Sequence, residues 1–168
     1  PLKMGLTLYM ICFIISLLAL FALFVGDKSM TENQKPAKKK SAPSPNGRPT
    51  IGFLTSNMSR FFHLMWCGIA DVARERNINA LSFVGEYVNF PENVWSQANI
   101  LYDLIDVERL DGLVIWGLNC NLLDADETRQ FYERYRPLSI VSVGQPMAGV
   151  TSVLADNYGG MREAIEHL

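Results

Sequence analysis

The sequence has few residues of the types that bind metals, form disulfides or hold phosphates. It contains three cysteines and two histidines. No two cysteines have the CxxC spacing of a zinc or redox motif, and no Gly-rich phosphate loop is present. Cys12, Cys67 and Cys120 are therefore expected to serve as small apolar side chains. We expect no metal and no cofactor.

The sequence also lacks an excess of positive charge. Charged residues make up 19% of the chain, and the formal net charge is −2. Proteins that bind nucleic acids through phosphate contacts carry a basic surface, and the overall composition gives no sign of one. We expect no nucleic acid to be bound by this chain.

One pair of side chains has a spacing that catalysis could use. His63 and Cys67 stand four residues apart in a predicted helix, so they lie on the same face and can meet. A cysteine activated by a histidine is a nucleophile, but such a pair needs a third group to orient the histidine. None is evident, and Cys67 lies among apolar residues. We therefore predict that the chain is not an enzyme, and an α/β hydrolase-like enzyme is kept as a competing class.

The strongest feature that is present is an uncharged apolar run, Met4–Gly26. A membrane-spanning helix needs about 20 such residues. A cleaved signal peptide would have a shorter apolar region and small residues at its cleavage site, which FALFVGD lacks. A lipoprotein signal would use Cys12, but Ile11 before it is large. We predict that residues 1–27 form a single transmembrane helix that anchors the chain, with a buried core helix as the alternative.

Residues 28–48 are polar and rich in lysine and proline, without a periodic apolar face. They are predicted to be a disordered tether. Lys38, Lys39 and Lys40 either contact anionic lipid head groups or belong to a solvated linker. The excess of basic residues after the apolar run favours a cytoplasmic position for the following domain. A periplasmic domain stays open, because large domains translocate regardless of flanking charge.

Residues 49–168 alternate between strand-like and helix-like segments. This alternation predicts an α/β fold with a doubly wound parallel sheet in the strand order 2-1-3-4-5. The predicted strands are Thr50–Thr55, Ala80–Val84, Gly112–Trp116, Leu138–Val143 and Thr151–Ala155.

Four helices are predicted between and after these strands. The first follows Ser59 as its N-cap and buries Phe62, Met65, Ile69, Val72 and Ala73. The second covers Pro91–Asp106, with an apolar face of Val94, Ala98, Leu101, Leu104 and Ile105. The third covers Asp124–Arg136. The last is capped by Asn157, and its Met161, Ala164, Ile165 and Leu168 are expected to face inward.

Four short patterns, in order, resemble a known family. The first has Asn57, Phe61, Phe62, Gly68, Ile69 and Ala73; the second has Leu101, Leu104 and the run Asp111–Val114; the third is a strand that ends in Val143 and Gly144; the fourth has Ser152, Val153, Asp156, Asn157, Gly160, Ala164, His167 and Leu168. Together they resemble the first lobe of the ligand-sensing domain of lactose/galactose-type repressors, which is similar to type I periplasmic sugar-binding proteins. The run from Arg136 to Met161 is also similar to sensors joined to histidine-kinase or diguanylate-cyclase modules.

The resemblance implies a membrane-anchored sensing domain, in a bacterial signalling or regulatory protein, that binds a small polar ligand such as a sugar. Its second lobe and a downstream effector are expected partners outside this fragment, and a homodimer stays open. The repressors carry a DNA-binding module where this chain has the apolar segment and the tether. The alternatives are a solute-binding component of an uptake system and a repressor relative without its DNA-binding module.

The resemblance places ligand contacts in the loops that follow the parallel strands. Sugars need an aromatic face for their C–H surfaces and planar amides or carboxylates for their hydroxyls. The predicted ligand-binding residues are Asn57, Arg60, Phe61, Trp116, Asn119, Gln145 and Asp156. Three of them have a structural alternative: Phe61 as a core residue, Trp116 as the end of a buried strand, and Asp156 as a helix cap.

Overall fold

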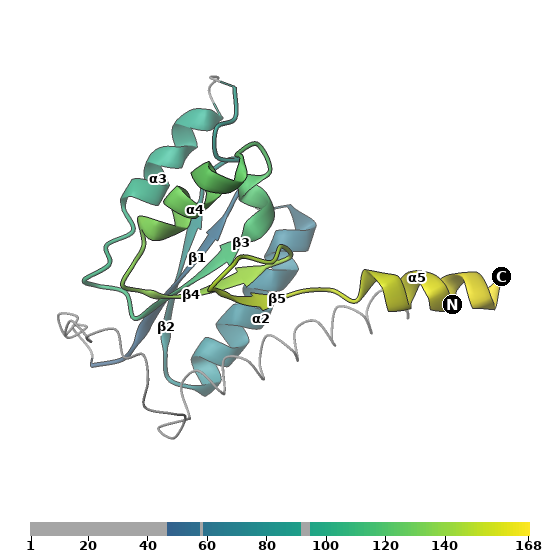
Figure 1. Ribbon diagram of the computed structural model, residues 1–168. Helices are drawn as coiled ribbons and strands as arrows, with labels where there is room; N and C mark the ends of the chain where they lie inside the picture. Colours follow the sequence, from purple (N-terminus) through teal and green to yellow (C-terminus); the bar gives the residue numbers. More distant parts are fainter. Residues whose placement is uncertain (1–46, 58, 92–94) are drawn as a thin grey trace.

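The computed structural model describes residues 47–57, 59–91 and 95–168 (Figure 1). The predicted membrane segment and all but the last two residues of the predicted tether lie outside the described residues. In the part of the chain that is described, no helix is both long enough and apolar enough to cross a membrane.

A five-stranded parallel sheet forms the centre of the domain, in the order β2-β1-β3-β4-β5. The predicted α/β class and strand order are therefore confirmed. Both β1 and β3 are buried along their whole length, as expected for apolar strands in the middle of a covered sheet. The strands are β1 (Thr50–Thr55), β2 (Asn79–Val84), β3 (Gly112–Trp116), β4 (Ser139–Val143) and β5 (Thr151–Val153).

Helices cover both faces of the sheet. The long helix α2 (Arg60–Glu75) lies on one face, and α4 (Ala125–Glu133) lies on the other together with the short α3 (Ile100–Asp103) (Figure 1). Two single 3-10 turns are also present: η1 (Ser96–Asn99) leads into α3, and η2 (Gly117–Cys120) follows β3. This arrangement is the doubly wound, three-layer architecture that the alternation of elements predicts.

Two apolar cores lie on the two faces of the sheet, because neighbouring residues of a strand point to opposite sides. In β1, Phe53 belongs to the core beneath α2, and Leu54 belongs to the core beneath α3 and α4. In β3, Val114 belongs to the core beneath α2, and Ile115 belongs to the core beneath α3 and α4.

Helix α2 buries most of the stripe that its sequence predicts. Phe62, Met65, Ile69 and Ala73 are all buried against the sheet. Ser59 precedes the helix, but its side chain makes no capping hydrogen bond. Instead, the side-chain Oδ1 of Asn57 accepts a hydrogen bond from the backbone N–H of Ser59, with 2.9 Å between the two atoms. The turn before α2 is therefore held by Asn57.

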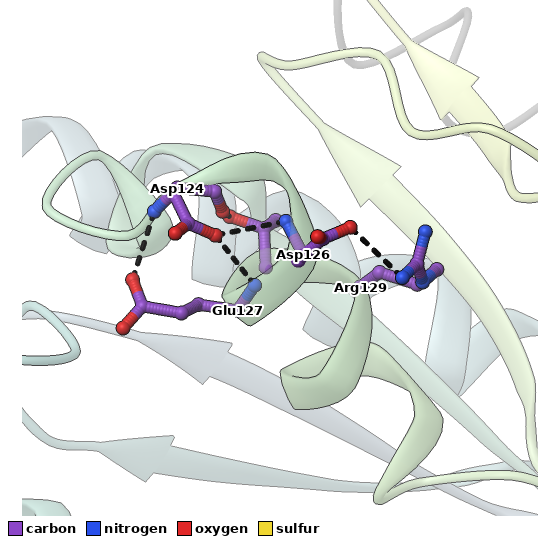
Figure 2. Close-up of polar contacts among 5 residues, drawn as sticks. Asp124, Asp126, Glu127 and Arg129 are labelled. Carbon is purple, nitrogen blue, oxygen red and sulfur yellow. Dashed lines mark hydrogen bonds and ion pairs between the residues drawn. The ribbon is translucent and has the colours of Figure 1, made fainter.

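A capping box starts α4 directly after the loop that follows β3 (Figure 2). Asp124 Oδ1 accepts from the backbone N–H groups of Asp126 and Glu127, at 2.9 and 2.8 Å. Glu127 Oε2 accepts from the backbone N–H of Asp124 at 2.9 Å. Because both bonds are made, the helix start is fixed, and so is the far end of the loop that contains η2.

The predicted helix over Pro91–Asp106 is wrong in its length, and its predicted apolar face is only partly right: Ile105 is buried in the core and Leu104 is not, while Val94 lies outside the described residues. The structure has only η1 and α3 between Ser96 and Asp103. Leu104, expected inside, is 64% exposed, whereas Tyr102 is 3% exposed. The physical reason is the change of helix type, because a 3-10 turn has three residues per turn and rotates the side chains away from an α-helical stripe.

The inward face predicted for the last helix is also wrong. In α5 (Asn157–His167) no residue is buried, and Met161 and Ile165 are 63% and 65% exposed. The helix extends away from the sheet (Figure 1), and its N-cap is Asp156 instead of the predicted Asn157. The apolar spacing correctly marks one side of the helix as apolar, but spacing carries no information about what covers that side.

Candidate functional site

The loops after β1, β3 and β4 lie at one edge of the sheet, because all strands are parallel and their carboxyl ends share that edge. Six of the seven predicted ligand-binding residues lie in these loops or at the adjoining ends of α2 and β3: Asn57, Arg60, Phe61, Trp116, Asn119 and Gln145. In open α/β sheets, ligands bind outside the carboxyl ends of the strands. We therefore describe this edge as the candidate site.

Three aromatic rings, two from the start of α2 and one from the end of β3, pack together at the site. Phe61 lies edge-on to Phe62 and to Trp116, with 5.4 Å between ring centroids in both pairs. Phe62 and Trp116 lie 5.3 Å apart, also edge to face. Phe62 is 6% and Trp116 is 9% exposed, but Phe61 is 40% exposed. This aromatic cluster therefore has a buried base and one ring open to solvent.

Two glycines let the loops after β3 and β4 pack closely around this cluster. Gly144 has a φ of +83°, and a Cβ atom there would lie 2.8 Å from a ring carbon of Trp116. A Cβ atom on Gly117 would lie 2.7 Å from Cβ of Gln145. Any larger residue at either position would push the indole or Gln145 out of place. The two glycines thus bring Gln145 beside the loop that follows Trp116.

Two buried amide oxygens at this edge receive no hydrogen bond within the described structure: Oδ1 of Asn119 and Oε1 of Gln145. Asn119 is 0% exposed, its Nδ2 donates to the hydroxyl of Tyr102 at 3.4 Å, and its backbone carbonyl accepts from Val88 N–H at 2.8 Å. A buried acceptor without a donor is costly, roughly 1–3 kcal/mol. An ordered water or a bound ligand can supply the missing donor.

Tyr102 joins the ends of the first three strands, and sequence reasoning missed it. Its hydroxyl lies 3.0 Å from the carbonyl oxygen of Thr55 and 2.8 Å from that of Glu86, and it accepts from Asn119. Burial raises the pKa of Tyr102 far above its ordinary value, and the charges of Tyr135, Glu86 and Cys120 raise it further. The hydroxyl therefore keeps its proton and donates it to one of the two carbonyl groups.

The loop after β4 is held by a second tyrosine. The hydroxyl of Ser142 donates to the backbone carbonyl of Gln145 at 2.7 Å, and the Tyr132 hydroxyl lies 3.0 Å from Ser142 Oγ. Because the serine proton points to Gln145, Tyr132 is the donor in the second contact. Burial raises the pKa of Tyr132 to about 12, although the hydrogen bond to Ser142 lowers it. The hydroxyl chain that positions Gln145 therefore stays protonated at neutral pH.

The other predicted residues have simpler placements. Asn57 forms the turn before α2, and Arg60 is the first, exposed residue of that helix, next to Phe61. Asp156 accepts from the backbone N–H of Gly159 at 2.9 Å and caps α5, which agrees with its structural alternative. The structure thus brings Phe61 and Trp116 together and places Gln145 beside Gly117, in the loop after Trp116. It places Asp156 at the start of a helix that leads away from the sheet.

The spacing of Tyr102 could not have revealed its role, because the residue lies beside, not on, the apolar stripe predicted for its helix. The available signal was a tyrosine within the apolar run around Leu101 and Leu104, because a tyrosine that is buried usually needs a hydrogen-bond partner for its hydroxyl. Gly117 and Gly144 each directly follow a predicted strand, and a glycine there often marks a close approach of two chain segments.

Searches against protein-family models, curated proteins and solved structures found no match to this chain.

Proposed function

We propose that the carboxyl edge of the sheet binds a small, neutral, hydroxyl-rich ligand such as a sugar. In this proposal the chain is the first lobe of a membrane-anchored sensing domain. The aromatic cluster supplies a face for the C–H surface of the ligand. The side-chain amide of Gln145, at the same edge, supplies hydrogen-bond partners for the hydroxyl groups.

A single observation supports the proposal best. An aromatic ring that is 40% exposed stands against a buried tryptophan, at the same edge as the Gln145 amide oxygen, which receives no hydrogen bond within the described residues. Ligand pockets combine such apolar and aromatic walls with a few placed polar groups. A hydroxyl group of the ligand is a donor of the kind that Gln145 Oε1 lacks.

Anchoring and signalling extend the proposal beyond the described residues. The uncharged run Met4–Gly26 has the length of a membrane span, and residues 28–48 have the composition of a flexible tether. A second lobe would cover the outer side of the ligand, and closure of the two lobes would be passed to an effector. The exposed apolar residues of α5 agree with a helix that packs on such a second lobe.

Nuclear magnetic resonance tests the ligand site on the chain as it is. The chain in mild detergent, labelled with nitrogen-15, is titrated with a panel of neutral monosaccharides. We expect a dissociation constant of about 1 mM or weaker, because one lobe leaves the outer face of the ligand in water. The shifted signals should be the Trp116 indole N–H, the Gln145 side-chain amide and the backbone N–H of Phe61.

Urea and glycerol, each added separately to the same buffer, serve as controls for general polar additives. Shifts confined to the loops after β1, β3 and β4 support the site. Shifts that map to the opposite, amino-terminal edge of the strands would contradict it, and so would an absence of shifts with every sugar in the panel.

A further inference from the structure

Helix α2 carries two side chains that can ligate a metal ion, His63 and Cys67, on the side away from its buried residues. His63 is exposed and Cys67 is half-buried, whereas the apolar stripe of the same helix faces the sheet. The two side chains lie four residues apart, and Sγ of Cys67 is 3.7 Å from Nε2 of His63. The two side chains, which their spacing allows to meet, are therefore in contact.

This separation matches the distance between two ligands of one metal ion. In a tetrahedral zinc site, Zn–S is about 2.3 Å and Zn–N is about 2.0–2.1 Å, which places the two ligand atoms about 3.6 Å apart. A metal ion could thus bridge His63 and Cys67 at the separation that the two ligand atoms already have.

We propose that His63 and Cys67 form a two-ligand chelate for Zn²⁺ on the surface of α2. A thiolate and an imidazole favour Zn²⁺ over Mg²⁺ and Ca²⁺, which prefer oxygen ligands. On binding, the thiol releases its proton to water, and the imidazole binds through the lone pair of neutral Nε2. Water molecules fill the remaining positions. This site does not depend on the proposed sugar site.

Within the described residues, the protein supplies two ligands to this chelate and no third one. Asp71 lies one turn beyond Cys67, and its carboxylate is paired with Arg74 at 3.0 Å. Within the described residues, no group of three or more histidine, cysteine and acidic side chains is arranged to hold a metal. The site thus keeps open positions for water or for an added ligand.

The helix gives the chelate a fixed frame. The backbone N–H of His63 donates to the carbonyl of Ser59 at 2.8 Å, and Met65 and Ile69 anchor the same turns in the core. Because the backbone is already ordered, metal binding orders only two side chains, and this preorganisation favours binding.

Cobalt spectroscopy tests the chelate, because a thiolate bound to Co²⁺ gives a charge-transfer absorption band that zinc does not. The full chain in mild detergent, with its thiols reduced, is titrated with Co²⁺ and then with Zn²⁺. We expect the band to appear with Co²⁺, to disappear when Zn²⁺ displaces it, and to be unaffected by excess Mg²⁺.

Variants assign the band to the two residues. Cys67→Ser should remove it, and His63→Ala should weaken Co²⁺ binding at least about tenfold, the loss that even an outer-shell partner of a metal ligand causes. His167→Ala and Cys12→Ala are the matched controls and should keep both the band and the affinity. Circular dichroism confirms that every variant is folded. A band that persists in Cys67→Ser, an affinity unchanged in His63→Ala, or no band in the unaltered chain would each overturn the proposal.

Discussion

Replacing Tyr102 by phenylalanine removes one oxygen atom from the point where three strands end. The ring stays, so the apolar packing around Phe131 is kept. What is lost is the hydroxyl that donates to the carbonyl of Thr55 or Glu86 and accepts from Asn119. The perturbation is therefore almost purely one of hydrogen bonding.

The magnitude follows from these contacts. One neutral hydrogen bond contributes about 1 kcal/mol, and a buried amide donor left without its acceptor costs roughly 1–3 kcal/mol more. Asn119 is 0% exposed, so water does not replace the lost acceptor. We expect Tyr102→Phe to lower the free energy of unfolding by about 2–3 kcal/mol.

Urea unfolding measures this difference. The transition is followed by tryptophan fluorescence and analysed by linear extrapolation. Tyr158→Phe is the matched control, because Tyr158 is 82% exposed, and it should change stability by less than about 0.5 kcal/mol. If Tyr102→Phe is as stable as the control, the hydroxyl does not hold the three strand ends together.

Three further substitutions or conditions have defined outcomes. Gly144→Ala should destabilise the fold by at least about 1–2 kcal/mol, because its φ of +83° disfavours a side chain and the added methyl group meets Trp116; a neutral effect in urea unfolding would contradict this packing. Asp124→Ala should cost about 1 kcal/mol through loss of the capping box, and an equal loss in Asp126→Ala, which leaves the cap intact, would refute the assignment. Burial raises the pKa of Cys120 from 9.0 to about 12, so the unfolded chain ionises first, and stability should fall as the pH rises above about 9. That fall should start later, near pH 10, in Cys120→Ala, where the buried tyrosines remain; identical pH profiles would count against a buried, protonated thiol.

The sheet could be predicted from the sequence because its signals are local. Thr50–Thr55 and Gly112–Trp116 are short apolar runs bounded by helix-like segments, and their bounds agree with β1 and β3. The strand order follows from parallel strands joined by right-handed crossovers. The same reasoning places the loops after β1, β3 and β4 at one edge.

The details of the site could not be predicted, because they depend on contacts between distant segments. Whether Phe61 is a core or a surface residue depends on how α2 lies over Trp116. In the structure, the Phe61 ring packs against Trp116 and is still 40% exposed. The role of Tyr102 depends on carbonyl groups of β1 and of the loop after β2, 47 and 16 residues earlier in the chain. Such pairings have no short-range signature in the sequence.

The last helix illustrates the limit of periodic patterns most clearly. Met161, Ile165 and Leu168 recur at helical spacing, and all three are exposed. A hydrophobic stripe reports that a helix has a side suited to burial, but the partner can lie in another part of the chain.

The most direct test of the ligand site is to measure stability and sugar binding together for Phe61→Ala. Phe61 is 40% exposed, so the substitution should cost about 2 kcal/mol, less than the roughly 3–5 kcal/mol of a fully buried phenylalanine. Leu81→Ala, at an exposed apolar position on β2, is the control for nonspecific loss of surface. The account predicts that sugar-induced shifts of the Trp116 indole signal are lost in Phe61→Ala and retained in Leu81→Ala. Unchanged shifts in a folded Phe61→Ala variant would contradict it.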